Sequence, residues 1–264
     1  MKGRLGRIFR EDGRSLIIPI DHGLSGPIMP GWEDPAVTLH RVIEGGPDGI
    51  LTSFGVLKQY REIMAGKVAT LLRLDGWATQ FQEERHLRWP LLYTVEDALR
   101  LGADGVIVVG HFGAPCELET IQTIARVASD CQKWDMPLAV EPLPFPGPRV
   151  KNVRDAETIA GVTRVAAELG ADFIKTYYTG SAESFCKVTS YCPVPVLIAG
   201  GPRMETDRDV LETVHGMLEG GGKGIFFGRN VWQHRDPTGI TRALRRIIHE
   251  GASVDTALEE LRGR

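Results

Sequence analysis

A lysine inside an apolar stretch is the most informative reactive residue of this sequence. Lys175 lies within residues 172–177, a stretch whose composition is typical of a buried β-strand. Burial disfavours the ammonium form, and the neutral amine attacks carbonyl groups to form imines. Because side chains alternate along a strand, Tyr177 is expected on the same face as Lys175. The pattern predicts a Schiff-base lysine or, as the alternative, a buried ion pair with Asp21 or Glu141.

Polar side chains also close other apolar stretches. Asp21 and His22 directly follow residues 16–20, and Glu141 follows residues 138–140. If these stretches are parallel strands of a barrel, their carboxyl ends meet at one mouth, where barrel enzymes place their chemistry. For Asp21 and His22, the alternative is a carboxylate that caps a loop beside a packed ring. Three further polar groups near strand ends are expected to face a substrate, namely Arg73, Asp75 and His111.

Glycine turns follow the last two apolar stretches. Gly200 and Gly201 come after one of them, and Gly228 and Arg229 come after the other. Exposed backbone N–H groups bind phosphate, and many barrels build a phosphate site after strands seven and eight. A guanidinium adds a charge-assisted hydrogen bond. Glycines also serve tight turns, but their presence at both positions favours a phosphate site.

Short apolar stretches alternate with helical patterns along the whole chain. The expected strands are residues 16–20, 49–53, 69–74, 105–109, 138–140, 172–177, 196–199 and 224–227. The expected helices are residues 36–44, 95–101, 118–133, 156–169, 182–188, 210–219 and 240–250, with a terminal helix at 256–262. This order predicts one domain over residues 1–264, a single (β/α)8 TIM barrel. The alternative is an open, doubly wound sheet.

Composition narrows the class of protein. The net charge of −3, from 31 basic and 34 acidic residues among 264, argues against a nucleic-acid partner. No stretch approaches the roughly 18 apolar residues of a membrane span, and no secretion signal follows Met1. The 4 cysteines lack CxxC spacing and are expected to be reduced core thiols. We therefore expect a soluble, cytoplasmic protein with no metal site and no cofactor.

Four motifs, in order along the chain, resemble the archaeal-type class I fructose-bisphosphate aldolase superfamily. This superfamily includes 2-amino-3,7-dideoxy-heptulosonate synthase and the autoinducer-2 phosphate thiolase. The motifs are IDHG at 20–23, KTYYTG at 175–180, PVLIAGGP at 195–202 and FGRNV at 227–231. The resemblance covers nearly the whole chain, and residues 239–260 are most similar to the heptulosonate synthases.

The resemblance implies a (β/α)8 barrel in which Lys175 forms the Schiff base and Asp21 relays protons. It also implies phosphate binding at the two glycine turns and at Arg229. Members of the superfamily commonly form ring-like decamers, so the resemblance implies a homo-oligomer. No metal and no cofactor take part in the chemistry that it implies.

One departure from the aldolase pattern concerns the fifth strand. These aldolases carry a catalytic Tyr there, before a Pro-Arg-Gly stretch, whereas Leu143 stands at that position in this sequence. Leucine cannot transfer a proton. Glu141 and Tyr177 are the candidates to replace the missing tyrosine as acid or base.

The expected function is a class I, metal-independent aldolase that acts on a phosphorylated ketose or keto compound with a dihydroxyacetone-phosphate-type donor, in carbohydrate metabolism. One alternative is a transferase of the heptulosonate synthase type. Another is a thiolase-type transferase that uses Lys175 and His22 as an acid–base pair. A third is a barrel that binds a phosphorylated metabolite without catalysis.

Overall fold

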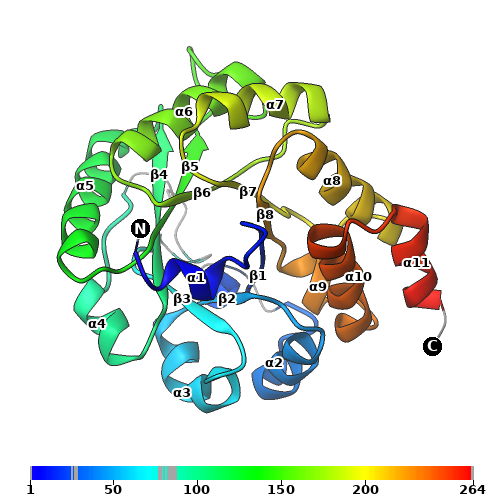
Figure 1. The fold of residues 1–264 in the computed structure, drawn as a ribbon. Helices are drawn as coiled ribbons and strands as arrows, with labels where there is room; N and C mark the ends of the chain where they lie inside the picture. Colours follow the sequence, from blue (N-terminus) through cyan, green and yellow to red (C-terminus); the bar gives the residue numbers. More distant parts are fainter. Residues whose placement is uncertain are drawn as a thin grey trace.

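A computed structural model describes residues 2–24, 26, 29–76, 79, 81 and 88–262. Eight parallel strands form a closed barrel in which each strand pairs with the next and β8 pairs with β1 (Figure 1). The strands are β1 (Ser15–Pro19), β2 (Gly49–Thr52), β3 (Ala69–Arg73), β4 (Gly105–Phe112), β5 (Leu138–Pro144), β6 (Phe173–Thr176), β7 (Val196–Ala199) and β8 (Gly224–Phe226). The prediction of a single TIM barrel is confirmed, and the open sheet is excluded.

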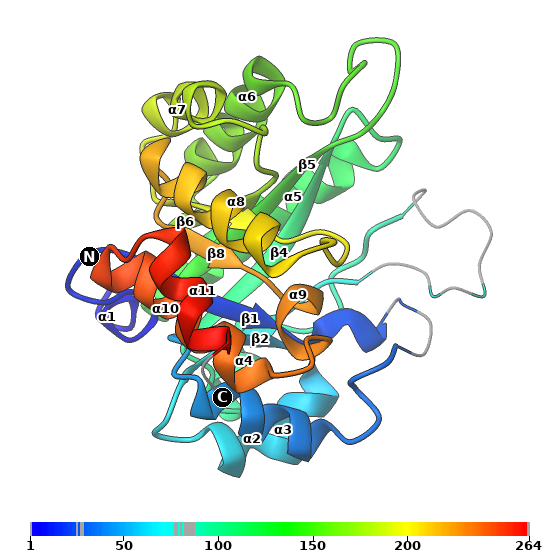
Figure 2. The ribbon, with the colours of Figure 1, turned by 90° about the vertical axis from the view of Figure 1, so that its right-hand side faces the viewer.

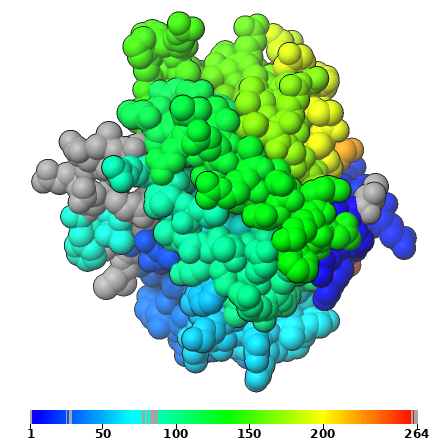
Figure 3. Space-filling model, turned by 90° about the vertical axis from the view of Figure 1, so that its left-hand side faces the viewer, coloured from blue at the N-terminus to red at the C-terminus, as the bar shows by residue number. Residues whose placement is uncertain are grey.

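Helices surround the barrel (Figure 1). They are α2 (Pro35–Glu44), α3 (Phe54–Met64), α4 (Val95–Arg100), α5 (Glu117–Lys133), α6 (Ala156–Glu168), α7 (Ala182–Tyr191), α8 (Asp207–Glu219), α10 (Pro237–Glu250) and α11 (Val254–Arg262), with short helices α1 (Leu5–Ile8), η1 (Asp21–Leu24) and α9 (Arg229–Trp232). The terminal helix α11 contacts α8 and α10. On the side drawn in Figure 3, side chains of the middle part of the chain, in green and cyan, cover the barrel wall.

The sequence analysis missed α3. Its apolar residues do recur at helical spacing, with Leu57 and Met64 buried and Phe54, Tyr60 and Ile63 packed against the core. The pattern for this helix was therefore present in the sequence and was overlooked. The sequence analysis also missed α1 and α9, which have 4 residues each. Such short helices carry almost no periodic signal.

The barrel interior is apolar at one end and charged at the other. An inner cluster includes Ile17, Phe173 and Phe226, and Ile8 of α1 belongs to it. Lys175 follows Phe173 by two residues on β6, and its Nζ lies 5.5 Å from the centroid of the Phe226 ring. The connections that follow the strands lie at the end opposite α1 (Figure 2). The charged residues therefore lie at the carboxyl ends of the strands, as predicted.

Two strands are longer than expected. β4 and β5 continue as a paired ladder that reaches Phe112 and Pro144. His111 and Glu141 are consequently parts of strands and do not follow them. Among the cysteines, Cys186 is exposed on α7, so the prediction of core packing is wrong for this thiol; the other cysteines are buried. Within the described ranges, no helix is both long and apolar enough to cross a membrane.

Candidate active site

A cavity of about 730 Å³ opens at the carboxyl ends of the strands. It brings together most of the residues that the sequence analysis selected. These are Asp21, His22, Arg73, Glu141, Lys175, Tyr177, Gly200, Gly201, Gly228 and Arg229. Asp75 and His111 lie outside this lining.

Lys175 and Glu141 form an ion pair at the base of the cavity. The Nζ atom of Lys175 lies 2.8 Å from Oε1 of Glu141, and both residues are 8% exposed. The other oxygen of Glu141 accepts a hydrogen bond of 2.8 Å from Nη2 of Arg73. Neighbouring strands β5 and β6 thus place a base directly beside the amine. The buried ion pair, which the sequence left open as the alternative to a Schiff-base lysine, is present, with Glu141 as the partner.

Arg73 ends β3 and joins the carboxylates of three elements. Its Nε donates to Asp21 of η1, and its Nη1 donates to Asp75 at 3.2 Å. With the bond to Glu141, every nitrogen of this guanidinium has a carboxylate partner. Arg73 lines the cavity but is only 3% exposed. Three of its five N–H donors are therefore used within the protein.

The charges of this cluster keep two carboxyl groups ionised. Burial by itself raises the pKa of Asp21, but the charges of Arg73, His22 and Lys175 outweigh burial and lower this pKa to about 2. Burial likewise raises the pKa of Glu141, and the charges of Lys175 and Arg73 bring it below its usual value. Both groups are carboxylates near neutral pH and accept protons or hydrogen bonds.

Asp75 and His111 do not line this cavity, so its geometry gives no support to the expectation that they contact a substrate, which stays a prediction. Asp75 is 0% exposed, and its carboxylate accepts hydrogen bonds from the backbone N–H of Val109 and from Nε1 of Trp89, the latter at 2.8 Å. The ring of His111 packs against Trp89, with centroids 4.1 Å apart. These partners lie on β4 and on the segment before α4, and they draw both side chains into the wall of the barrel.

Tyr177 lines the cavity and is covered by an arginine that the sequence analysis missed. The guanidinium of Arg154 lies 5.1 Å from the centroid of the Tyr177 ring, and its Nη1 donates to the carbonyl oxygen of Tyr178 at 3.1 Å. Burial and the charge of Glu141 raise the pKa of Tyr177, so its hydroxyl keeps its proton. Arg154 lies between β5 and α6, away from any strand end, and no sequence signal marked it.

Leu143, which stands at the sequence position of the family's tyrosine, does not line the cavity. It packs against a cluster that includes Trp89 and Cys116. Within the described part of the chain, Glu141 and Tyr177 remain the proton-transfer candidates on β5 and after β6.

The two glycine turns leave room at the other side of the cavity. A methyl group on Gly200 would lie 2.9 Å from Cδ1 of Phe227, and one on Gly228 would lie 2.7 Å from the carbonyl oxygen of Pro19. Gly201 has a φ of 65°, a conformation that favours glycine. Side chains at these positions would fill or distort the turns, so the backbone itself lines the cavity.

Arg229 and His22 adjoin these turns. Nε of Arg229 is buried without a hydrogen-bond partner among the described residues. This N–H group is a donor that could bind an anion. Burial lowers the pKa of His22, which favours its neutral form, and its Nδ1 lies 3.8 Å from Asp21. The sequence analysis missed Asn230, whose side chain donates to the carbonyl oxygens of Gly200 and Pro202 at 3.2 and 3.3 Å. Asn230 thus ties the turn after β7 to α9.

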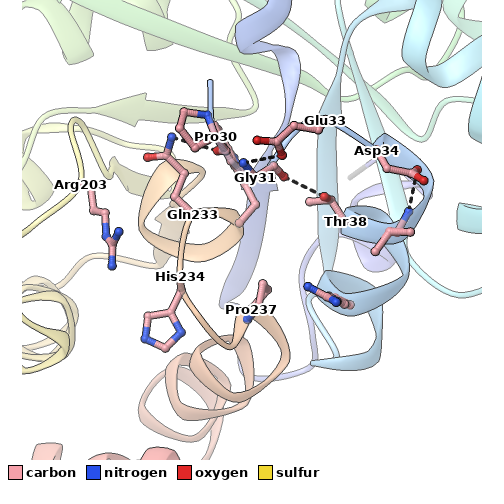
Figure 4. Close-up of a pocket in the computed structure, with 12 residues that line it drawn as sticks. Pro30, Gly31, Glu33, Asp34, Thr38, Arg203, Gln233, His234 and Pro237 are labelled. Carbon is pink, nitrogen blue, oxygen red and sulfur yellow. Dashed lines mark hydrogen bonds between the residues drawn. The ribbon is translucent and has the colours of Figure 1, made fainter. Parts of the chain in front are cut away.

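A second cavity of about 400 Å³ adjoins the first and shares Arg203 and Gln233 with it (Figure 4). Its polar groups are largely occupied by local contacts. Asp34 caps α2, and the ring of His234 lies between Asp207 and the backbone N–H of Asp236. In the described residues, no group of three or more His, Cys, Asp or Glu side chains is arranged to hold a metal ion.

Comparisons with known proteins agree with this geometry. The model of the DeoC/LacD family aldolases matches residues 15–234. The class 1 fructose-bisphosphate aldolase of Thermoproteus tenax is 36% identical over 93% of both chains. A 2-amino-4,5-dihydroxy-6-oxo-7-(phosphonooxy)heptanoate synthase of Streptomyces griseus is 33% identical over 95% of this chain and 90% of its own length.

Solved structures give the same result. An archaeal fructose 1,6-bisphosphate aldolase superposes with a TM-score of 0.87 and 35% identity, over 95% of this chain and 99% of its own. Another, in which the catalytic lysine is covalently bound to the carbinolamine intermediate of its substrate, has a TM-score of 0.86 at 35% identity and covers 94% of this chain and 98% of its own. These relatives favour an enzyme over a barrel that only binds metabolites. The chain belongs to the DeoC/LacD aldolase family and is an enzyme of the class I, Schiff-base aldolase type.

Proposed function

We propose that this enzyme makes or breaks a C–C bond in a phosphorylated keto compound, with Lys175 as the imine-forming residue and dihydroxyacetone phosphate as the type of donor. One observation carries the proposal: the Lys175 amine lies in the cavity 2.8 Å from a carboxylate base, and the glycine turns line the same cavity. This arrangement supports the combination of a nucleophile, its base and an anion site in one cavity.

Glu141 activates the amine. The proton moves from Nζ of Lys175 to Oε1 of Glu141, and the nitrogen lone pair then attacks the ketone carbon. Asp21, held by Arg73, moves a proton from the nitrogen to the oxygen of the carbinolamine. Glu141 then returns the proton that it took from Lys175 to the carbinolamine hydroxyl group, which leaves as water, and Glu141 is a carboxylate again. The resulting iminium accepts the electron pair of the adjacent C–C bond, which breaks to an enamine.

The aldol hydroxyl group loses its proton during cleavage. Glu141 is the better supported acceptor, because neighbouring charges lower its pKa and leave it as a carboxylate. The pKa of Tyr177 is raised, so its hydroxyl donates a hydrogen bond to the reacting oxygen and does not act as the base. His22 remains a further proton-transfer candidate beside Asp21.

The donor phosphate lies against the turns at Gly200, Gly201 and Gly228. Backbone N–H groups and the unpartnered Nε of Arg229 bind its oxygens. Because this group is remote from the carbon that reacts, its binding energy orients the ketone toward Lys175.

Borohydride trapping tests this function. The protein is incubated with dihydroxyacetone phosphate and borohydride, and intact mass and peptide mapping locate the reduced adduct. We expect one adduct on Lys175, absent from K175M. Absence of an adduct with this donor and with other phosphorylated ketones would reject imine chemistry at this site.

A transferase of the aminated heptulosonate synthase type is the second candidate. It is supported by the similarity to the Streptomyces griseus synthase and by Leu143, which removes the strand-five tyrosine. Transfer of the donor carbons to an amino-acid semialdehyde would favour it over an aldolase. A dependence on coenzyme A would favour the thiolase-type alternative, with Lys175 and His22 as the acid–base pair.

We also propose that the enzyme is a cytoplasmic homo-oligomer, with a decamer as the expected assembly, on the basis of the resemblance to its superfamily. Light scattering of the purified protein measures the assembly mass. A mass equal to the 29.0 kDa of one chain would reject the oligomer.

A further inference from the structure

Arg73 differs from Arg229 in that each of its three guanidinium nitrogens already binds a carboxylate. Its three donor nitrogens contact Asp21, Asp75 and Glu141, and it is 3% exposed. By contrast, Nε of Arg229 has no partner among the described residues. Arg73 is therefore a poor phosphate ligand, and its role must lie in what it does to the carboxylates.

The wall of the barrel holds Arg73 in place. Its partner Asp75 is 0% exposed and is itself held by the backbone N–H of Val109 and by Nε1 of Trp89. The guanidinium thus has a fixed anchor on the side away from the cavity. On the cavity side it contacts the two carboxylates nearest to the reaction, Asp21 and Glu141.

We propose that Arg73 is a positioning residue that keeps Asp21 and Glu141 ionised and oriented around Lys175, with Asp75 as its anchor. This inference rests on the proposed function, because it concerns the same amine and base. A planar guanidinium holds carboxylates at three separate nitrogens in a fixed fork, whereas an ammonium group carries all its donors on one nitrogen at the end of a flexible chain. The proton that leaves Lys175 then finds an unprotonated Glu141 as acceptor.

The charge around Glu141 explains why Arg73 is needed. The charged and titratable groups that face Glu141 or its partners are Asp21 and His22 after β1, Arg73 and Asp75 of the β3 end, Lys175 and Tyr177 of the β6 end, and Arg154 after β5. Without Arg73, the carboxylates of this cluster share Lys175 as their main cation. Glu141 would then take up a proton at higher pH and lose its capacity to accept one from Lys175.

Two variants of Arg73 distinguish a role in positioning the carboxylates from a role in stabilising the fold. R73M removes the charge, and R73K keeps one charge but replaces the three separate donor nitrogens by one. The matched control is R100K, because Arg100 is exposed on α4, outside the lining of the cavity, and forms its ion pair with Asp97 of the same helix. The first readout is the rate of adduct formation with dihydroxyacetone phosphate and borohydride as a function of pH. The second is the ¹³C carboxyl signal of Glu141 in protein labelled at glutamate, assigned by its loss in E141Q.

We expect the acid limb of the rate profile and the Glu141 titration to move upward together in R73M, by about one to three pH units, the usual effect of one close opposite charge. R73K should show a smaller shift, and R100K none. A purely structural role would lower the melting temperature while leaving both titrations where they are, and that result would overturn the inference.

The two proposals fail in different ways. Absence of an adduct on Lys175 in the unsubstituted protein contradicts the proposed function. An adduct that forms normally, with no shift of the Glu141 signal in R73M or R73K, contradicts the role of Arg73 alone. If R73M does not fold, R73K decides, and an unshifted Glu141 titration in R73K counts against the inference.

Discussion

Replacing Glu141 by Gln is the sharpest test of the site. Gln keeps the shape of the side chain but loses the charge and the capacity to take a proton from Lys175. In the structure, both oxygens of Glu141 accept bonds of 2.8 Å, one from Lys175 and one from Arg73. A glutamine presents one oxygen and one NH₂ group, so one of the two cations must lose its acceptor.

The expected loss of activity follows from this change. Proton transfer by a positioned group contributes about 10²–10⁴-fold to a rate, and we expect E141Q to lose activity within this range. Adduct formation on Lys175 should slow as well, because the base beside its amine is gone. Y177F is the comparison, since it removes a hydroxyl group but leaves the ion pair intact.

The stability of E141Q should depend on pH. A hydrogen bond to a charged group contributes about 1.5–3 kcal/mol, so E141Q should lose about this free energy of unfolding at pH 7. Because the fold lowers the pKa of Glu141 below its ordinary 4.5, its stabilisation is present above that value and disappears as pH falls through the lower, folded pKa. The difference between the two proteins should therefore shrink in acid.

Denaturant unfolding at several pH values measures the difference in stability, and trapping kinetics measure the chemistry. The reasoning is refuted if E141Q cleaves and traps at the unsubstituted rate while Y177F is inactive. That outcome would assign the base to Tyr177. A stability difference that grows in acid would show that Glu141 is not held as a carboxylate.

K175M should abolish the trapped adduct, while isothermal titration should show that the protein still binds inorganic phosphate. Loss of phosphate binding as well would contradict a phosphate site that is independent of Lys175. G228A should weaken phosphate binding about tenfold or more, which corresponds to about 1.4 kcal/mol of binding free energy, because its methyl group would lie 2.7 Å from the Pro19 carbonyl oxygen. G147A is the control and should leave phosphate binding unchanged, because no atom beyond the adjacent residues lies within 4 Å of the added methyl group. R154M should raise KM more than it lowers kcat, since Arg154 contacts the ring of Tyr177 but not the amine; an unchanged KM would argue that this arginine does not border the substrate.

Local patterns in the sequence were sufficient for the barrel and for the reactive amine. Strands buried on both faces are continuous apolar stretches, so their number and order can be read without a structure. Lys175 stands out because a lysine in such a stretch is costly, and the glycine turns stand out because they follow the last two strands. These patterns are local in the sequence, so they are recognised even when the predicted ends of the strands are wrong by one or two residues.

The arrangement of charges depended on the tertiary structure. Arg73 meets Asp21 and Glu141 across sequence separations of 52 and 68 residues. Asp75 follows the same strand as Arg73 yet turns into the barrel wall, because Trp89 and the Val109 backbone provide donors there. No local pattern predicts where a side chain at a strand end will point. The sequence by itself therefore determined most of the groups that gather at the mouth of the barrel, but not Arg154 or Asn230. Only the packing of neighbouring strands and loops decided which of these groups face the cavity and which bind one another.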